Sequence, residues 1–329
     1  MSVTIKTIAE STGLSISTVS RALAETGRIK QSTRETVLQA AKRLGYTPNA
    51  AAKALITGRS RSIGLVVPTV TNPFFTAVLK GAQARARSLG YILIVADSDE
   101  NPAVERALVA EFAARTEGVI VGVVPSATAD ADAESYASLG PMITINRQSD
   151  GISSACIDIS AGARQAMEHL AAQGHRRIAY LGGSEYSWMN NIQRASFAEE
   201  ANVAGMEFRE FGPYTTDAEG GASALEPVLA GKFTAAIAFN DLMAMGLIGR
   251  LMAKGFHCPD DLSVIGVDDI PYASMSYPPL TTIRVNPDRL GMAAVDALVA
   301  SFDAADASLH RSLLDTQLVV RSSTGAVPA

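Results

Sequence analysis

Four hydroxyl side chains and one arginine are crowded into the short stretch LSISTVSRAL, residues 14–23. They are Ser15, Ser17, Thr18, Ser20 and Arg21. Short hydroxyls let a helix approach a DNA duplex closely and bond to its phosphates or base edges, and an arginine can reach guanine or phosphate. A helix that only filled a core would not carry them. The stretch therefore predicts a DNA-contacting surface, and a small helical bundle with a polar outer face is the alternative.

A second set of polar side chains stands at the ends of strand-like runs: Asp97 in YILIVAD, Asn146 and Arg147 after PMITI, Asn240 after AAIAF and Asp268 after SVIGV. In open parallel sheets, ligands bind beyond the carboxyl ends of the strands. The segment TNPFF follows the first strand and can bring Asn72 and Phe74 or Phe75 over the same crevice. Amide and carboxylate groups facing an aromatic ring suit a hydroxyl-rich ligand such as a sugar. The alternative, that strand-end residues only cap the next helices, is preferred for Asp241 and Asp269.

Three short helices are expected to position the hydroxyl-rich stretch. Thr4 can cap a first helix over IKTIAEST, and Gly13 permits a tight turn after it. Ser15 then caps a second helix, and Ser32 with Glu35 forms a capping box for a third. Helix, glycine turn and helix is the arrangement that lays a second helix into the major groove of DNA.

The charge is unevenly divided along the chain. Residues 1–60 carry nine Lys or Arg and three Glu, a net charge of +6. The remainder carries 19 basic and 30 acidic residues, a net charge of −11. A basic end on an acidic body suggests that this end meets a polyanion, and chance clustering on a solvated surface is the alternative.

The chain from Ser62 onward alternates short apolar strands with amphipathic helical stretches, which indicates parallel sheets. Two sets of strands of similar length suit two halves. The predicted fold class is α/β, with an all-α helix-turn-helix head and two doubly wound parallel-sheet subdomains.

Several function classes find no support. There is no GxGxxG after a first strand, no P-loop and no GxSxG, so no enzyme chemistry and no cofactor are expected. Two cysteines lie far apart and four histidines are scattered without metal spacing, so no metal site is expected: Cys156, Cys258, His169, His175, His257 and His310. His175, in a turn before a strand, is interpreted as structural. The start MSVTIKTIAE has no apolar signal core and no run of 18 apolar residues occurs, so a cytoplasmic protein is expected.

A series of motifs runs in order along nearly the whole chain: TIKTIAESTGLSISTVSRAL, TRETVLQAAKRLGYTPNAAAKAL, IGLVVPTVTNPFF, GHRRIAYLGG, FNDLMAMG and VIGVDDIPYASMSYPPLTTIR. In these motifs the sequence resembles the lactose-repressor and purine-repressor family of bacterial regulators. The resemblance implies a DNA-binding head, a hinge helix with linker, and a dimerising, periplasmic-binding-protein-like core, at residues 1–47, 48–61 and 62–329. It also implies that the chain crosses three times between the core halves, here 62–160 plus 287–322, and 161–286.

The same resemblance assigns DNA contacts. Ile16, Ser17 and Arg21 match the base-reading positions of the recognition helix, and PNAAAKALITG matches a hinge helix that orders on DNA. There Leu55 of each subunit would wedge into the minor groove, a device that bends the duplex. A plain Ala-rich linker with Leu55 packed on the core is the alternative. The full predicted DNA-contact set is Thr4, Ser15, Ile16, Ser17, Thr18, Ser20, Arg21, Asn49, Ala52, Lys53 and Leu55.

The ligand pocket departs from the family in two ways. Asn146 stands where many members carry an aspartate, and Gln193 stands where many carry an arginine, for which Arg147 is a candidate replacement. Trp188 is expected at the cleft border, either stacking on a sugar or packing in a lid. The predicted effector-contact set is Asn72, Phe74, Phe75, Asp97, Asn146, Arg147, Trp188, Gln193, Asn240 and Asp268.

The sequence thus predicts a homodimeric, ligand-responsive transcriptional regulator that binds a pseudo-palindromic operator. Repression is its expected action, and a sugar or sugar derivative is its expected effector. Whether the ligand releases DNA or promotes binding stays open. The rivals are a solute-binding protein for sugar uptake without DNA function and an enzyme acting on sugars or nucleotides.

Overall fold

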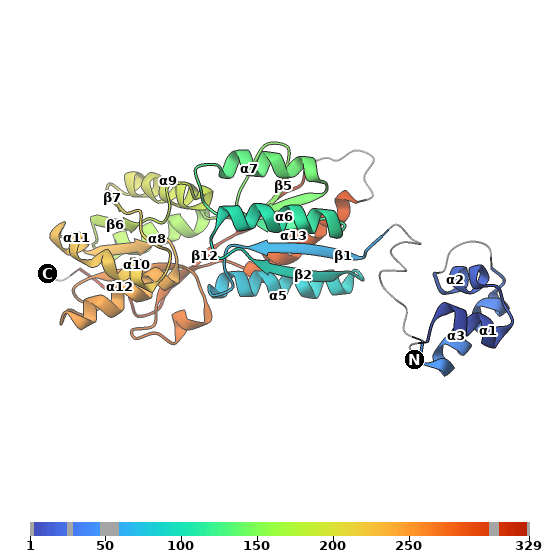
Figure 1. Ribbon diagram of the computed structural model, residues 1–329. Helices are drawn as coiled ribbons and strands as arrows, with labels where there is room; N and C mark the ends of the chain where they lie inside the picture. Colours follow the sequence, from blue (N-terminus) through green and yellow to red (C-terminus); the bar gives the residue numbers. More distant parts are fainter. Residues whose placement is uncertain (1–2, 25–28, 47–58, 303–308, 328–329) are drawn as a thin grey trace. The chain divides into compact units, whose positions relative to one another are not determined.

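The computed structural model describes residues 3–24, 29–46, 59–302 and 309–327 (Figure 1). The chain divides into two compact units, an N-terminal unit that ends at Arg61 and a core that begins at Ser62.

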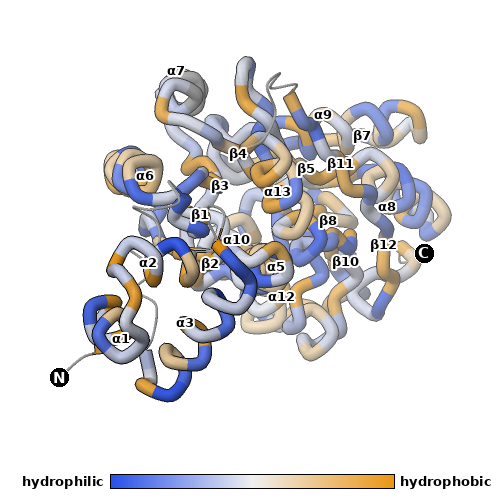
Figure 2. The backbone as a smooth tube through the Cα atoms, turned by 90° about the vertical axis from the view of Figure 1, so that its right-hand side faces the viewer, coloured by the Kyte–Doolittle hydropathy of each residue, from blue (hydrophilic) through white to orange (hydrophobic). Residues whose placement is uncertain are grey.

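The N-terminal unit contains three helices, α1 (Ile5–Thr12), α2 (Ile16–Ala24) and α3 (Gln31–Leu44). Their inward faces meet in one small cluster in which Ile8, Val19 and Val37 are fully buried. Hydrophobic residues recur at helical spacing, so each helix changes repeatedly between hydrophobic and hydrophilic along its length (Figure 2). Gly13 adopts φ 69°, a left-handed conformation that glycine reaches without strain, and it turns the chain from α1 into α2.

The predicted cap of α1 is confirmed and the predicted cap of α3 is wrong. The Thr4 hydroxyl accepts a hydrogen bond from the Thr7 backbone N–H at 3.4 Å. By contrast, α3 begins at Gln31, one residue earlier than Ser32, and no side chain caps it. The Gln31 amide donates to the Glu35 carboxylate at 3.1 Å, so Glu35 pairs along the helix surface instead of reaching back to the cap.

The first sheet of the core has the strand order β11-β5-β4-β3-β1-β2, and all its paired strands are parallel. Its strands are β1 (Ser62–Val67), β2 (Ile92–Asp97), β3 (Val119–Gly122), β4 (Met142–Ile145), β5 (Ser153–Asp158) and β11 (Arg311–Asp315). The associated helices are α5 (Pro73–Ser88), α6 (Pro102–Arg115), α7 (Ala129–Tyr136) with η1 (Ala137–Leu139), and α13 (Pro287–Ser301). Helices α5 and α13 pack together on one face, and α6 lies on the other beside α7 (Figure 1).

The second sheet has the order β12-β10-β9-β8-β6-β7, with only β12 antiparallel. Its strands are β6 (Arg177–Leu181), β7 (Glu207–Phe211), β8 (Ala235–Ala238), β9 (Ser263–Asp268), β10 (Thr281–Arg284) and β12 (Gln317–Val319). Its helices are α8 (Ser160–Ala172), α9 (Trp188–Val203), α10 (Ala218–Ser223), α11 (Leu225–Ala230), α12 (Asp241–Ala253) and η2 (Pro271–Ser274). An all-α unit followed by two parallel sheets is the predicted fold class, which is confirmed.

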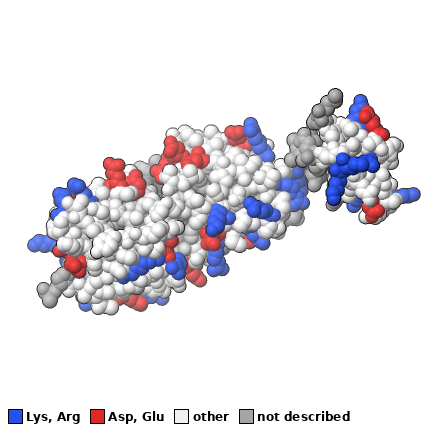
Figure 3. All heavy atoms as spheres, turned by 90° about the horizontal axis from the view of Figure 1, so that it is seen from below, with Lys and Arg blue, Asp and Glu red and all other residues white. Residues whose placement is uncertain are grey.

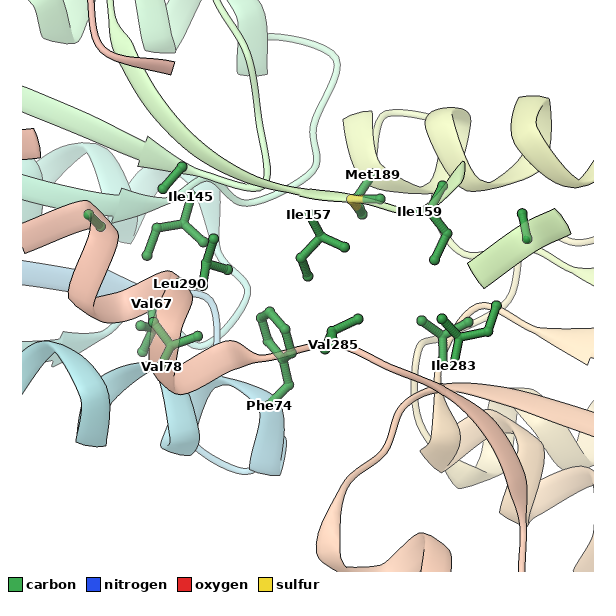
Figure 4. Packing of buried hydrophobic residues seen from close by; sticks show 14 of the residues in the cluster. Val67, Phe74, Val78, Ile145, Ile157, Ile159, Met189, Ile283, Val285 and Leu290 are labelled. Atoms are coloured by element: carbon green, nitrogen blue, oxygen red, sulfur yellow. The ribbon is translucent and has the colours of Figure 1, made fainter. Parts of the chain in front are cut away.

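Three segments connect the two sheets. The chain passes from β5 to α8, from β10 to α13, and from β11 to β12. Figure 4 shows Ile157 and Ile159 on the first crossing opposite Val285 and Ile283 on the second, all within one buried cluster. Each such side chain contributes about 1.5–3 kcal/mol when fully buried, so the crossings tie the halves together as well as connecting them.

The boundary between the halves differs from the prediction at its last segment. Residues 287–322 were expected in the first half, but β12 pairs with β10 of the second sheet, and Ser323 accepts from Val264 N–H. The strand enters the second sheet because its backbone groups there find the open edge of β10.

Two histidines, His175 buried and His169 half-buried, bond the C-terminal segment to the second half of the core. His175 Nε2 lies 3.1 Å from the Gly325 carbonyl, so this nitrogen donates and Nδ1 accepts from the Thr234 hydroxyl at 2.9 Å. His169 Nε2 lies 2.8 Å from the Thr324 hydroxyl. Burial lowers the pKa of both histidines. The structural interpretation of His175 therefore agrees with its contacts.

We expect His175→Gln to lower the free energy of unfolding by about 1–3 kcal/mol at neutral pH, because buried polar partners lose a hydrogen bond. The neutral ring is favoured in the fold, so the wild-type contribution is present above the ordinary histidine pKa of about 6.5 and is lost as pH falls through it. In urea titrations the difference in free energy of unfolding between wild type and His175→Gln should become smaller as pH falls toward about 5.5. His257 is exposed, and His257→Gln is the matched control. A difference between wild type and His175→Gln that does not depend on pH would contradict a neutral, buried His175.

Candidate functional site

The outer face of α2 presents the predicted polar set. Ser15 Oγ lies 2.9 Å from Ser17 Oγ and 2.8 Å from Thr18 Oγ1, and it caps the helix by accepting from the Thr18 backbone N–H. Arg21 is exposed, with Nε donating to the Ser17 carbonyl at 3.2 Å. Ile16 keeps 55% of its surface exposed, although it is apolar. The helix thus offers hydroxyls, a guanidinium and an apolar side chain on one accessible face.

The other predicted DNA contacts have different places. Thr4 is exposed and caps α1, and Ser20 is half-buried on α2. Asn49, Ala52, Lys53 and Leu55 lie outside the described residues. Lys and Arg side chains stand on the surface of the N-terminal unit in Figure 3.

A cavity of about 760 Å³ opens between the two halves of the core. Its walls come from the carboxyl ends of β1 to β4 in the first sheet and of β6 to β9 in the second. Seven of the ten predicted effector contacts line it: Asn72, Phe74, Phe75, Asn146, Gln193, Asn240 and Asp268. The rule that ligand sites lie beyond the carboxyl ends of parallel strands therefore locates this cavity from the sequence pattern.

The segment TNPFF fixes two aromatic rings at the cavity wall. Asn72 Oδ1 accepts from the Phe74 N–H at 2.9 Å, and Pro73 occupies the first position of α5. Asparagine at the N-cap and proline at the first helical position both favour a helix start here. The rings of Phe74 and Phe75 then pack edge to face with centroids 5.1 Å apart.

Two lining residues at strand ends have positive φ, Asn146 at 52° and Asp268 at 118°. Such conformations are uncommon for non-glycine residues and persist where the surrounding structure holds them. Asn146 Oδ1 accepts from the Ile157 N–H at 3.2 Å. Asn240 does two things at once: its Oδ1 caps α12 by accepting from Met243 N–H at 2.9 Å, and it lines the cavity. For this residue capping and lining the cavity are compatible.

Three predicted contacts do not line the cavity. Asp97 braces the loop after β2, because Oδ2 accepts from Val70 N–H at 2.8 Å and Oδ1 accepts from Asp99 N–H at 2.7 Å. Arg147 is buried behind the wall, close enough to Glu105 for its charge to lower the pKa of that carboxyl, although burial raises it more. Arg147 therefore does not take the place of the arginine that many family members carry where Gln193 stands.

Trp188, the third exception, begins α9 and packs against the large buried cluster. Of the two interpretations of Trp188, packing is the one that its contacts support. Its neighbours Tyr186 and Met189 line the cavity instead.

Sequence reasoning missed four of the five acidic residues and both tyrosines that line the cavity. Asp99 and Glu100 follow β2, Glu185 follows β6, and Asp217 precedes α10. Tyr186 and Tyr214 also line it. The run DSDE directly after YILIVA could have revealed the first two, since the strand-end rule applies to the whole loop and not only to its first residue. Nothing local marks the remaining four, Glu185, Tyr186, Tyr214 and Asp217.

Asp241 and Asp269 do not line the cavity, but neither caps a helix. Asp241 is buried and accepts from the Thr282 hydroxyl at 2.5 Å and from Ile270 N–H at 2.8 Å. Asp269 pairs with Arg284 and Arg321, each at 2.6 Å. Both carboxyls hold together the ends of β9 and β10 beneath the cavity.

Neither a membrane helix nor a metal centre is found among the described residues. No helix there is long and apolar enough to cross a membrane. No group of three or more His, Cys, Asp or Glu in the described part of the chain is arranged to hold a metal ion.

The helix-turn-helix unit and the cavity between two parallel-sheet halves define a DNA-binding regulator with a binding-protein-like core. The family model for "Bacterial regulatory proteins, lacI family" matches residues 4–49, and the model for "Periplasmic binding protein-like domain" matches residues 167–324. The HTH-type transcriptional regulator GalS of Salmonella typhimurium is 35% identical over 86% of this chain and 85% of its own length. The chain belongs to the lacI family of bacterial regulatory proteins.

Solved structures agree with this assignment. The lac repressor dimer bound to operator and the anti-inducer ONPF has a TM-score of 0.88 and 28% identity, covering 99% of this chain and all of that chain. The transcriptional regulator CelR in complex with cellobiose has a TM-score of 0.72 and 25% identity, covering 98% of this chain and 99% of that chain. The relatives are transcriptional regulators, so this chain is a transcriptional regulator and not an enzyme.

Asp241 should make stability depend on pH near neutrality. Burial raises the pKa of this carboxyl to about 7. Because the folded protein holds the proton more tightly than the unfolded chain, the contribution to stability is present at low pH and is lost as pH rises through about 7. We expect the free energy of unfolding of wild type, measured against Asp241→Asn, to fall by up to about 1.4 kcal/mol per pH unit as pH rises from about 4 to about 7, and to level off above that. Asp260→Asn, at an exposed carboxyl, is the control and should show no such trend. A difference in free energy of unfolding between wild type and Asp241→Asn that does not change with pH would refute the raised pKa of Asp241.

Proposed function

We propose that this regulator is a homodimeric repressor whose operator affinity is changed by a small hydroxyl-rich ligand bound in the core cavity. The observation that carries the proposal is the cavity itself, whose amide, hydroxyl and aromatic lining comes from both halves. A ligand that touches both halves stabilises one relative arrangement of them. It shifts the equilibrium by its difference in affinity for the two states, and a coupling of about 1–3 kcal/mol gives roughly 5- to 150-fold regulation.

We assign residues 1–47 to the DNA-binding head, 48–61 to the hinge and 62–329 to the core. In a dimer, two heads place their α2 helices in major grooves about one helical turn apart, on a pseudo-palindromic operator. The exposed Ile16, Ser17 and Arg21 are the base-reading candidates. The structural relative described as a repressor dimer bound to operator supports this arrangement. Because the target is DNA, we place the protein in the cytoplasm.

A sugar or sugar derivative fits the lining best. Asn146, Asn240 and Asp268 supply amide and carboxyl groups at strand ends, and Phe74 and Phe75 supply apolar ring surface. A sugar presents hydroxyls at its edges and C–H groups on its faces, which match these two kinds of wall. The relative in complex with cellobiose supports the same class of ligand.

The direct test is selection of bound sequences from a random duplex library with the purified full-length protein. A pseudo-palindromic consensus is expected, and adding the effector should change its affinity. A protein that enriches no consensus would contradict the regulator assignment and favour the solute-binding alternative. The basic N-terminal unit argues against that alternative, because sugar capture has no use for it.

We expect Arg21→Ala to weaken binding to the selected operator by about 1–3 kcal/mol and to relax sequence preference at one position, because a bidentate base contact is lost. Fluorescence anisotropy against specific and scrambled duplexes measures both effects. Arg209→Ala, an exposed arginine on the core strand β7, is the control and should bind as wild type does. Unaltered operator binding by Arg21→Ala would rule out a base contact.

We expect Leu55→Ala to weaken specific binding and to reduce the bend of the operator. An apolar side chain inserted between base pairs unstacks them and bends the duplex, and the bent duplex makes more contacts with the protein. Gel mobility of circularly permuted operator fragments reports the bend. Wild-type affinity together with a wild-type bend would remove Leu55 from the interface.

A further inference from the structure

The lining of the cavity is strongly one-sided in charge. Five acidic residues contribute to it: Asp99, Glu100, Glu185, Asp217 and Asp268. Among the described residues that line it there is no lysine, arginine or histidine. A ligand with a phosphate or carboxylate would find no cation there to compensate its charge.

Two of these carboxylates, Glu100 and Asp217, line the cavity from opposite halves of the core. Glu100 follows β2 of the first sheet, and Asp217 caps α10 of the second half. Burial raises the pKa of Glu100, and the Asp217 charge raises it further, ahead of Asp99 and Asp97. The negative charge of Asp217 therefore disfavours ionisation of Glu100.

Asp217 is held as an anion by its local structure. Its Oδ1 accepts from the Gly220 N–H and from the Thr215 hydroxyl, both at 2.8 Å, and the backbone bonds lower the pKa of the carboxyl. Asp217 thus lines the cavity as an anchored carboxylate.

The loop that carries Glu100 is fixed in position. Asp99 and Glu100 have φ of 51° and 52°, and Glu100 N–H donates to the Pro68 carbonyl at 2.8 Å. Asp97 ties the same loop to Val70. Each half thus presents an anchored carboxylate to the cavity.

An independent observation marks a ligand deeper in the same cavity. Gln193 is only 4% exposed and lines the wall. Its carbonyl accepts from the Tyr180 hydroxyl at 3.3 Å, but its amide nitrogen has no acceptor within the described part of the chain. The Asp268 carboxyl likewise receives no hydrogen bond from the described residues, and burial raises its pKa. Gln193 therefore has an amide donor left for a ligand oxygen at the cavity wall, since polar groups of nearly buried side chains are almost always paired.

We propose that the effector is a hydroxyl-rich molecule with a protonated amine, and that Glu100 and Asp217 hold the amine between the two halves. This inference rests on the proposed function, in which the cavity is the effector site. An ammonium group donates up to three hydrogen bonds and can satisfy both carboxylates at once. Its positive charge also offsets the repulsion between the two carboxylates, so binding favours the approach of the two halves.

The test compares matched probes on the purified full-length protein by calorimetry: glucosamine with glucose, galactosamine with galactose, and 1-amino-1-deoxysorbitol with sorbitol. Glucose 6-phosphate and gluconate supply the anionic arm. We expect at least one amine to bind about tenfold more tightly than its neutral parent at low salt. That ratio should shrink at high salt, because screening weakens charge pairing, and the anions should bind worst.

The variants Glu100→Gln and Asp217→Asn should each reduce the ratio of amine to neutral affinity toward one. Asparagine keeps the cap of α10, so the loss reports charge and not folding. Glu199→Gln, at an exposed carboxyl of α9 outside the cavity lining, is the matched control and should keep the wild-type ratio. Thermal unfolding without ligand checks that all three variants fold.

The inference is overturned if amine and parent bind equally, if an anion binds best, if no amine binds below about 10 mM, or if both variants keep the wild-type ratio. A neutral sugar that binds and changes operator affinity would leave the proposed function standing and remove only the amine. An amine that binds with the expected ratio but leaves operator affinity unchanged would support the amine site and contradict the proposed function.

Discussion

The two sheets of the core share a single buried cluster that passes beneath the cavity. Ile157 and Ile159 on one crossing pack opposite Val285 and Ile283 on another, with Phe74 beside them (Figure 4). Because these side chains lie in the crossings or in the strand ends that lead into them, the halves can change their mutual angle only by repacking this cluster. Packed interiors allow a few discrete arrangements and resist continuous deformation, which is what a ligand-controlled switch needs.

The polar architecture around the cavity follows from the same constraint. Both sheets present carboxyl ends of strands to one gap, so the loops after β1 to β4 and after β6 to β9 contribute to its walls. Asp241 and Asp269 anchor the floor through Thr282 and Arg321, and Asp97 anchors the rim. By contrast, Glu100 and Asp217 line the cavity itself, each held by hydrogen bonds to the backbone. Anchoring of the strand ends and lining of the cavity are therefore divided between different acids in neighbouring loops.

Local pattern predicted much of the cavity correctly. Strand-end asparagines and the TNPFF segment identified residues that line it, because strand polarity alone determines which end of a parallel sheet is open. The same rule failed for Asp97 and Arg147, whose side chains turn away from the gap. At a strand end the side chain can point to either side of the sheet, and the neighbouring loop decides which. The cap of α3 failed for a similar reason, since the carboxylate of Glu35 had a nearer partner.

The sequence by itself determined the helix-turn-helix unit, the alternation of strands and helices, and the family, because these depend on residue spacing of a few positions. Only the tertiary structure decided that Glu100 and Asp217 line one cavity from opposite halves, that Arg147 is buried away from the cavity lining, and that β12 joins the second sheet. Those facts depend on pairs of residues far apart along the chain, brought together by packing of the two halves. Pairwise charge and burial are properties of that packing, and no local pattern encodes them.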